Sequence, residues 1–365
     1  MTSVLLYEFA TGGGLLGAGD ETALASLRRE GAAMLRALAA DFAAIAGFQT
    51  TVLLAADQCS RHARRDDPHA EREEYTRRSS LNSSLAGCRI LPVRSPGEDL
   101  EVLERLAPQA DWTVVIAPEL DGLLEARLEI VVSAGGRLLG PSPELAALAA
   151  DKQRLAEHLA AAGVPVAEGV STGPACPLPG DFSYPAVFKP RFGAGSQDVW
   201  LIPDAAVARR VRGTLGRPGR LERYYPGLAA SVAFLCGPAG RFPLLSCRQR
   251  LTADGRFQYL GGSCPLEAAF GGRAERLAAQ AVAALPSPVG YIGVDLVLGA
   301  DPSGTDDRVI EINPRLTTSY VGLRAVCAVN LAEAMIAAAE GRAVRLSWLD
   351  RRVEFDRDGM VRASD

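Results

Sequence analysis

The chain has 365 residues, and 48% of them are hydrophobic, which is enough for two or three packed domains. Lys and Arg number 39 against 43 Asp and Glu, so there is no basic excess to bind nucleic acid or an anionic membrane surface. No apolar stretch approaches the roughly 20 residues that span a bilayer, and no N-terminal leader is evident, so we expect a cytoplasmic protein without nucleic-acid or membrane partners.

Glycines follow the first predicted strand, in the stretch LLYEFATGGGLLGAGD at residues 5–20. Gly12, Gly14 and Gly17 have the GxGxxG spacing of a dinucleotide-binding turn. Such a turn needs a helix that begins inside the motif and an acidic residue about 20 positions beyond it. Here the helix is predicted to begin after Asp20, and the acidic end of the next strand lies much further along the chain. We therefore expect the nucleotide to bind elsewhere.

The first 140 residues alternate between strands and helices. The predicted elements are a helix at 21–45, strands at 49–57, 111–119 and 137–140, and an amphipathic helix that ends near Ala134. Because this alternation is typical of a parallel sheet with helices on its faces, we predict a Rossmann-like α/β domain here.

A cluster of metal-binding residue types lies in the same region. Cys59, His62 and His69 are close enough in sequence to suggest a zinc site. They lie in or beside the charged run SRHARRDDPHAEREEYTRR at 60–78, and a solvated loop or helix surface accounts better for that composition. The seven cysteines of the chain include no CxxC pair and are typical of reduced, mostly buried thiols.

A helix with clear ends opens the middle of the chain. Ser142 is placed to cap it, Pro143 stands at its first helical position, and Gly163 ends it. A Pro- and Gly-rich connector follows at 171–185, and beyond it short strands separated by turns predict antiparallel pairing in an α+β arrangement. These strands are expected at 186–190, 198–202, 230–236, 242–251 and 256–262.

A loop containing glycines joins two strands in AVFKPRFGAGSQDVWLI, residues 186–202. Gly193 and Gly195 permit a tight turn whose backbone N–H groups can point at phosphate, and Lys189 adds a positive charge on a rigid strand. The hairpin could close over the phosphates of ATP. The alternative is a hairpin whose turn uses glycine for steric reasons alone.

The stretch LERYYPGLAASV at 221–232 carries Glu222, Tyr224 and Tyr225 into a Pro-Gly turn. Its backbone could face the edge of an adenine ring. A simple linker between domains would have the same composition.

The strongest chemical signal lies in GYIGVDLVLGADPSGTDDRVIEINPRLTTS, residues 290–319. Two strands joined by a polar turn carry Asp295 and Glu311, and the alternation of a strand puts Asn313 on the same face as Glu311. Three such oxygen ligands suit a Mg²⁺–nucleotide, and Arg315 could reach a phosphate or a substrate carboxylate. The alternative is an edge hairpin with solvated charges.

These stretches, together with DKQRLAEHLAAAGVPV at 151–166, resemble the ATP-grasp superfamily in order and spacing over roughly residues 140–340. With its first domain the chain resembles the three-part layout of D-alanine–D-alanine ligase and carbamoyl phosphate synthetase. The resemblance implies that ATP is held between a mobile lid and a C-terminal antiparallel sheet. It implies a pre-ATP-grasp domain at 1–140, a connecting helix and lid at 141–226, and a C-terminal domain with the metal site at 227–365.

The resemblance also implies roles for individual residues. The ATP phosphates would be contacted by Lys152, Lys189 and the loop with Gly193, Gly195 and Ser196. The adenine would be held by Glu222 and the backbone near Tyr224. Mg²⁺ or Mn²⁺ would be held by Asp295, Glu311 and Asn313, with Glu311 bridging two ions. The predicted hinge runs from Glu222 to Gly227. Two residues after Gly227, many members of the superfamily have a glutamate that binds ribose. This chain has Ala229 there, so no ribose contact is assigned.

Within the superfamily, the stretches YEFATGGG, IAPE, GPSPE, CRQR, YLGGSCP and INPRLTTSY resemble the tyramine–L-glutamate ligase family of methanofuran biosynthesis and its bacterial relatives. This implies an ADP-forming ligase in which a carboxylate attacks the γ-phosphate of ATP and an amine displaces phosphate from the acylphosphate. Glutamate and tyramine, tyrosine or a similar amine are the expected substrates, Lys189 and Arg315 the expected catalytic residues, and a homodimer the expected assembly.

The glycine turn near the N-terminus then has a second interpretation, because open α/β sheets place ligands at the C-terminal ends of their strands. We predict that Thr11, Gly12 and Gly13 border the site of the carboxylate or amine substrate, with Glu8 as a candidate for contact with an ammonium group. The alternative is a turn that only lets the strand and the helix pack.

Other functions remain open. On the same fold, a carboxylase would pass the activated carboxylate to another acceptor, and a regulatory protein would bind ATP without turnover. The stretch GVSTG at 169–173 matches GxSxG, but it runs into a proline-rich connector rather than a helix, which disfavours a serine hydrolase.

Overall fold

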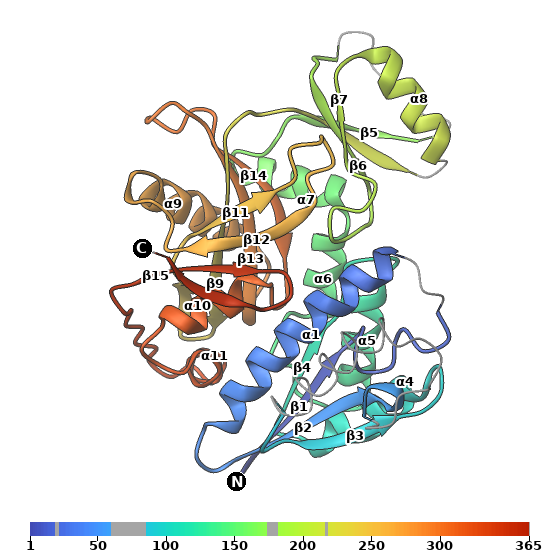
Figure 1. The fold of residues 1–365 in the computed structure, drawn as a ribbon, viewed down its shortest axis with the longest axis vertical. Helices are drawn as coiled ribbons and strands as arrows, with labels where there is room; N and C mark the ends of the chain where they lie inside the picture. Colours follow the sequence, from blue (N-terminus) through green and yellow to red (C-terminus); the bar gives the residue numbers. More distant parts are fainter. Residues whose placement is uncertain (19–21, 60–84, 174–181, 216–217, 365) are drawn as a thin grey trace.

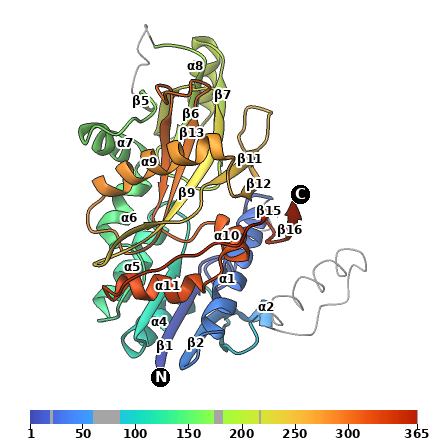
Figure 2. The ribbon, with the colours of Figure 1, turned by 90° about the vertical axis from the view of Figure 1, so that its left-hand side faces the viewer.

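The structure is a computed structural model that describes residues 1–18, 22–59, 85–173, 182–215 and 218–364. Within these residues the strands form three sheets that follow one another along the long axis of the molecule (Figure 1). The view in Figure 2, turned by 90°, shows the same order, with the sheet of β5–β8 at one end and the N-terminal sheet at the other. No helix in the described part of the chain is long and apolar enough to cross a membrane.

The N-terminal sheet is parallel, with the strand order β3-β2-β1-β4. Its strands are apolar on both faces, because Leu6 and Val52 pack toward α1 whereas Leu5 and Leu53 pack toward α4 and α5. The elements are β1 (Thr2–Glu8), α1 (Thr22–Ala43), β2 (Phe48–Ala55), α2 (Ala56–Cys59), β3 (Arg89–Val93), α4 (Glu98–Leu106), the 3₁₀ turn η1 (Ala107–Gln109), β4 (Trp112–Ile116) and α5 (Leu123–Ser133).

One strand of this sheet was not predicted, and one prediction is wrong. Strand β3, for which no prediction was made, lies at the edge of the sheet, where the missing N–H donor of Pro92 is tolerated. The short strand expected at 137–140 is only a single bridge between Thr113 and Leu138, because only Thr113 exchanges hydrogen bonds with this segment.

The helix expected from Ser142 to Gly163 is two helices, α6 (Pro143–Ala150) and α7 (Lys152–Ala161). Ser142 caps α6 as predicted. The break falls at Asp151, which has an extended backbone and whose carboxylate accepts hydrogen bonds from the N–H groups of Gln153 and Arg154. Asp151 therefore starts a new helix and places Lys152 at its first position.

The second sheet, which we call the lid sheet, is antiparallel, with the strand order β5-β8-β6-β7. Its elements are β5 (Gly169–Thr172), β6 (Ala186–Pro190), β7 (Trp200–Ile202), α8 (Ala205–Leu215) and β8 (Gly219–Arg223). Helix α8 covers one face of the sheet around Phe188, Ile202 and Leu221. The opposite face is left free to form one wall of a site.

The third sheet has the strand order β14-β13-β9-β11-β12-β15-β16, with β10 paired to β9. Its strands are β9 (Leu228–Gly237), β10 (Gly240–Pro243), β11 (Cys247–Leu251), β12 (Tyr259–Cys264), β13 (Gly290–Leu298), β14 (Arg308–Asn313), β15 (Arg352–Asp356) and β16 (Val361–Ser364), and its helices are α9 (Ala268–Ala284), α10 (Ser319–Val326) and α11 (Leu331–Ala339). The single strand expected at 242–251 is two strands, because Pro243 lacks the N–H group that continued pairing would need.

Helix α1 belongs to the N-terminal domain but shares a core with the third sheet. Leu35 and Leu38 of α1 lie in one hydrophobic cluster with Leu323 of α10 and Met335 of α11. Asp41 of α1 extends this contact, because its carboxylate accepts hydrogen bonds from the hydroxyl of Tyr320 and the guanidinium of Arg324. This packing fixes α1 against the third sheet.

Candidate active site

An open cleft lies between the lid sheet and the third sheet, with a volume of about 1440 Å³ that includes the space at its mouth. Its lid wall comes from β6 and the loop at 191–199, and its inner end comes from the hinge at 223–225. Its floor comes from β9, β11, β12, β13 and β14, and Glu30 of α1 adds one side chain from the N-terminal domain. All of the residues that the sequence predicted for ATP, metal and catalysis line this cleft.

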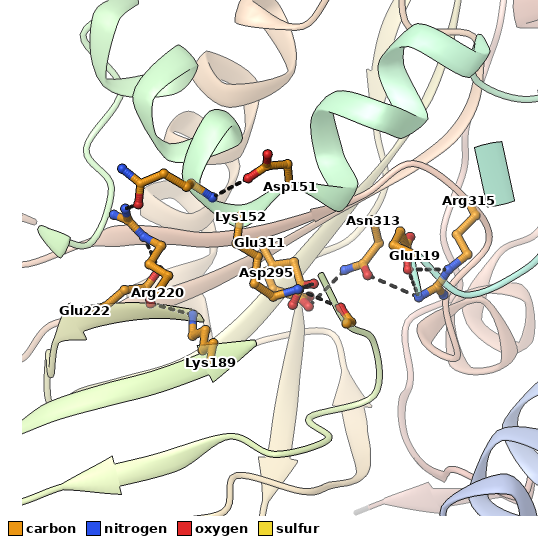
Figure 3. Close-up of polar contacts among 12 residues, drawn as sticks. Glu119, Asp151, Lys152, Lys189, Arg220, Glu222, Asp295, Glu311, Asn313 and Arg315 are labelled. Atoms are coloured by element: carbon orange, nitrogen blue, oxygen red, sulfur yellow. Dashed lines mark hydrogen bonds and ion pairs between the residues drawn. The ribbon is translucent and has the colours of Figure 1, made fainter. Parts of the chain in front are cut away.

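The strands β13 and β14 form the hairpin that the sequence predicted. Asp295 lies directly opposite Glu311, and the amide of Asn313 donates to Asp295 Oδ2 at 3.0 Å (Figure 3). Gln249 of β11 donates to the other carboxylate oxygen of Asp295 at 2.9 Å. Burial, and next the charge of Glu311, raise the pKa of Asp295 to about 7. Two acidic groups are thus held together against their repulsion.

Lys152 connects this hairpin to the lid. Its Nζ lies 3.0 Å from Glu311 Oε1 and donates to the carbonyl oxygen of Gly193 at 2.7 Å. Burial alone would raise the pKa of Glu311, but the charges of Lys152 and Lys189 outweigh it and lower that pKa. Glu311 is therefore ionised beside two cations.

Lys189 on β6 is held by an acidic residue of the neighbouring strand. Its Nζ lies 2.6 Å from Glu222 Oε2, and the other oxygen of Glu222 accepts from Arg220 Nε at 2.9 Å. Both carboxylate oxygens of Glu222 are thus engaged inside the lid sheet, so its side chain orients Lys189. The N–H of Tyr224 is also engaged, because it donates to the carbonyl of Pro185. Glu222 and Tyr224 both line the cleft, and their contact with adenine stays a prediction.

The two lysines are unusual in this chain. Among its 39 basic residues, Lys152 and Lys189 are the only lysines, and both line the cleft. An ammonium group presents three donors from a compact charge, whereas a guanidinium presents a planar fork. Both lysine side chains are more than 90% buried, so each positive charge is directed at the cleft and not at bulk solvent.

The loop at 191–199 carries Gly193, Gly195 and Ser196 along the lid wall. Gly195 and Ser196 have positive φ angles of 66° and 57°, which turn the backbone sharply. Among the described residues, no hydrogen bond engages the N–H groups of residues 193–196. The loop therefore offers free donors next to Lys152, which is the arrangement that binds phosphate oxygens.

Arg315 follows β14 and is held by the N-terminal domain. Its Nε and Nη2 donate to one oxygen of Glu119, at 3.1 and 2.7 Å, and the second oxygen of Glu119 is buried without a hydrogen-bond partner. Burial alone would lower the pKa of Arg315, but the charge of Glu119 raises it, so the guanidinium stays positive at the cleft. Glu119 belongs to the quoted stretch IAPE, but no role for it was predicted.

The glycine turn after β1 does not line the cleft. Thr11, Gly12 and Gly13 are buried, and a Cβ atom added to Gly13 would lie 2.5 Å from Val93. Glu8 accepts hydrogen bonds from the N–H groups of Ala10 and Thr11 and from the Thr11 hydroxyl, so its carboxylate caps its own turn. Burial raises the pKa of Glu8 to about 7. The structure therefore does not bring these four predicted substrate residues to the cleft.

Several cleft residues were missed in the sequence. They are Glu30, Gln249, Tyr259 and the residues at 317–319, which line the end of the cleft that Arg315 occupies. Their stretches carry no spacing signal, because tertiary packing alone brings α1, β12 and the start of α10 together. The candidate zinc residues His62 and His69 and the side chain of Cys59 lie outside the described residues. No cluster of three His, Cys, Asp or Glu side chains suited to a metal ion occurs in the part of the chain that the structure describes.

The residues of the hairpin nevertheless fit a divalent cation that nucleotide phosphates help to ligate. Asp295 and Glu311 face each other, and Asn313 adds an amide at the same place. A cation between the two carboxylates would relieve the repulsion that contributes to the raised pKa of Asp295. Oxygen ligands of this kind suit Mg²⁺, which keeps several positions for phosphate and water.

The fold and the site define a class of protein. Residues 149–319 match the family model of the ATP-grasp domain, and residues 75–145 match that of the pre ATP-grasp 3 domain. Residues 149–319 therefore resemble an ATP-grasp domain that follows a pre-ATP-grasp domain at 75–145. No curated protein matches it significantly.

Solved structures share this fold over nearly the whole chain. A protein from Archaeoglobus fulgidus assigned to the ATP-grasp superfamily is 21% identical with a TM-score of 0.66, covering 98% of this chain and 92% of its own. The ADP complex of N5-carboxyaminoimidazole synthetase from Staphylococcus aureus is 14% identical with a TM-score of 0.65, covering 97% and 81%. The biotin carboxylase domain dimer of 2-oxoglutarate carboxylase from Hydrogenobacter thermophilus, with MgADP, ADP and bicarbonate, is 17% identical with a TM-score of 0.66, covering 97% and 73%.

Proposed function

We propose that this protein is an ATP-dependent, ADP-forming ligase that joins a carboxylate to an amine through an acylphosphate. The observation that carries the proposal is the convergence of Lys152, Lys189 and the free N–H donors of residues 193–196 opposite the acidic hairpin. Cationic groups and amide donors on one wall suit phosphate oxygens, and carboxylates on the other wall suit a cation bound to those oxygens.

The residues of the cleft divide the work of phosphoryl transfer. Asp295, Glu311 and Asn313 would hold Mg²⁺ or Mn²⁺, which when bound neutralises charge on the phosphates. Lys189, fixed by Glu222, stabilises the negative charge that grows on the transferred group, and Arg315, fixed by Glu119, holds the carboxylate that attacks it. Closure of the lid sheet excludes water, which would otherwise hydrolyse the acylphosphate.

The finer proposal concerns the substrates. The stretches CRQR, YLGGSCP and INPRLTTSY supply Gln249, Tyr259 and the residues at 315–319 of the cleft, so the residues that carry the likeness to tyramine–L-glutamate ligases line the same end of the site. We therefore propose glutamate as the acid and tyramine, tyrosine or a similar amine as the acceptor, in a methanofuran-type cofactor pathway. By analogy with the Hydrogenobacter thermophilus domain dimer, we propose a homodimer.

The test is turnover by the purified full-length chain. ATP–Mg²⁺ is combined with a panel of amino acids crossed with amines, glutamate with tyramine or tyrosine first, and phosphate release and the mass of the product are measured. Amide formation with one ADP per product supports the ligase. Activity with another pair would overturn the substrates and keep the class. Binding of ATP–Mg²⁺ without ADP formation across the panel would indicate a non-catalytic protein.

A carboxylase is the second candidate. Two of the three similar structures have names that point to carboxylation, namely N5-carboxyaminoimidazole synthetase and the biotin carboxylase domain of 2-oxoglutarate carboxylase. Bicarbonate would then replace the organic acid as the group that attacks ATP. ADP formation that depends on bicarbonate and needs no amino acid would favour this function over the amide ligase.

The scarcity of lysine gives a direct test of the ATP site. An amine-reactive acylating reagent can label only Lys152, Lys189 and the α-amino group of Met1, which is fully exposed. We expect ATP–Mg²⁺ to protect both lysines several-fold while labelling of Met1 stays unchanged, as read by mass spectrometry. Equal labelling with and without ATP would contradict the proposed phosphate contacts.

A further inference from the structure

One acidic side chain of the N-terminal domain reaches the cleft. Glu30 lies on α1, which packs against α10 and α11, and its side chain lines the cleft. In the cleft, Glu30 is accompanied by Arg315, by Tyr259 and by Thr317, Thr318 and Ser319. The set combines one positive group, one negative group and several hydroxyls.

Arginines act on Glu30 through space, but none of them forms a direct ion pair with it among the described residues. Its Oε1 accepts a hydrogen bond from Ser26 Oγ at 3.0 Å, one turn earlier on α1, and in the described part of the chain it forms no ion pair within 4 Å. The guanidinium of Arg315 acts on it only through space, because Arg315 is directly bonded to Glu119. Burial raises the pKa of Glu30 above its ordinary value, despite Ser26 and the surrounding arginines. A carboxylate in this position lacks a cationic partner.

Tyr259 marks the other side of this space. It lies on β12 at the cleft, and the charges of both Glu30 and Asp295 act on its hydroxyl. Among the described residues, no hydrogen bond involves that hydroxyl, and it is not among the buried polar atoms without a partner, so it is open to the cleft. A ligand group between Glu30 and Tyr259 would therefore lie next to the hairpin of β13 and β14. The acylphosphate would form at that hairpin.

We propose that Glu30 binds the amine substrate as a protonated primary ammonium group and accepts the proton that the amine must lose before it attacks. This inference rests on the proposed ligase function. The chemical class of the second substrate is thus a cationic primary amine, with its organic part toward Tyr259. A neutral acceptor such as water or a hydroxyl compound would leave Glu30 unpaired.

The proton and bond balance of the step is as follows. The ammonium transfers one proton to the Glu30 carboxylate and becomes a neutral amine. Its nitrogen then forms a bond to the acyl carbon, the bond from that carbon to the phosphate oxygen breaks, and the second proton of the nitrogen leaves with the phosphate. The products are the amide, hydrogen phosphate and a protonated Glu30, which returns its proton to solvent when the lid opens.

The experiment separates the two nucleophiles that can reach the acylphosphate. Hydroxylamine is uncharged at neutral pH, so it traps the acylphosphate as a hydroxamate without any need for an ammonium site. In Glu30→Gln, we expect kcat/KM for the ammonium substrate to fall about 10- to 100-fold, because a charge-assisted contact and a proton acceptor are lost. Hydroxamate formation from the same acid should stay within about twofold of the unchanged enzyme.

Two further variants complete the design. Glu101→Gln removes an exposed carboxylate on α4 and serves as the matched control, with both activities expected to be unchanged. Glu30→Asp should recover part of the lost amide formation, since it restores the charge. Equal loss of amide and hydroxamate in Glu30→Gln would overturn the inference and assign Glu30 a structural role, and full retention of both would do the same. Absence of hydroxamate with the unchanged enzyme and every acid tested would instead overturn the proposed ligase function.

Discussion

The turn after β1 and the loop after β6 are both rich in glycine, yet they use their backbone N–H groups in opposite ways. In the first, the N–H groups of Ala10 and Thr11 bind the Glu8 carboxylate, and those of Gly12 and Gly14 bind carbonyl oxygens of the same turn. In the second, among the described residues, the N–H groups at 193–196 have no partner and face the cleft beside Lys152. Only the second turn can bind an anion without breaking contacts that it already has.

The comparison shows what glycine spacing does and does not indicate. In the first turn, the glycines pack so closely against their surroundings that a side chain would not fit. A Cβ atom on Gly14 would lie 2.2 Å from the ring of Phe9. In the second loop, a Cβ atom on Gly193 would meet nothing closer than 3.6 Å. Spacing therefore predicts a tight turn, whereas free donors next to a cation identify an anion site.

The largest effect on activity is expected from the loss of Lys189, which lines the cleft together with the second loop. Lys189→Met removes a positive charge from the phosphate end of the cleft and leaves Glu222 bonded to Arg220. We expect kcat for ADP formation to fall about 10²- to 10³-fold, by analogy with the loss of one donor to a developing charge. Steady-state kinetics with the best substrate pair measures this. An unchanged kcat would remove Lys189 from the reaction and weaken the contrast between the two turns.

A smaller effect is expected from Glu119, which follows β4 at the same edge of the N-terminal sheet as the first turn. Glu119→Gln keeps a hydrogen-bond acceptor for Arg315 but removes the charge that orients it. We expect kcat/KM for the carboxylate substrate to fall about 10-fold, with a smaller change in the KM for ATP. Equal changes for both substrates would indicate that Glu119 only holds the two domains together.

The glycines themselves can be exchanged for alanine to compare the turns. Gly13 has a φ of 114° and packs against Val93 and Asp99, so Gly13→Ala should lower the free energy of unfolding by about 1–3 kcal/mol. Gly193→Ala fits its surroundings and should leave stability nearly unchanged. Thermal unfolding of both variants measures the difference. A stable Gly13→Ala with a raised KM for an organic substrate would return the first turn to the active site.

The sequence predicted the parts of this site that depend on local pattern. Strand alternation was sufficient to place Glu311 and Asn313 on one face, with Asp295 on the neighbouring strand, and the structure pairs Asp295 with Glu311. The break at Asp151 was not predicted, because an aspartate inside a helical pattern gives no sign of whether it will cap a new helix.

Long-range contacts were beyond local pattern. Glu30 reaches the cleft because α1 packs against the third sheet, and Glu119 holds Arg315 from the end of β4. Nothing in their own stretches indicates these partners. Glu222 illustrates the converse case. Its position on a hinge strand was predicted, but its contacts with Arg220 and Lys189, which occupy both of its oxygens, were not.

The smallest predicted effect concerns Glu8, whose pKa of about 7 in the folded protein lies above its ordinary value of 4.5 because of burial. Since the folded state then binds a proton more tightly than the unfolded chain, the contribution of Glu8 to stability is fully present below pH 4.5 and is lost as the pH rises through 7. Between pH 6 and 7 the loss should be roughly 1 kcal/mol. The pKa of Asp295 is also about 7, so the unchanged protein alone does not isolate Glu8. The pH dependence of the free energy of unfolding is therefore compared between the unchanged protein and Glu8→Gln, and we expect it to be less steep in the variant. The free energy of unfolding is measured by urea unfolding at several pH values. If it changes equally with pH in both proteins, the hydrogen bonds from Ala10 and Thr11 keep Glu8 ionised. The first turn would then hold a buried negative charge, whereas the second loop lies beside the positive charge of Lys152.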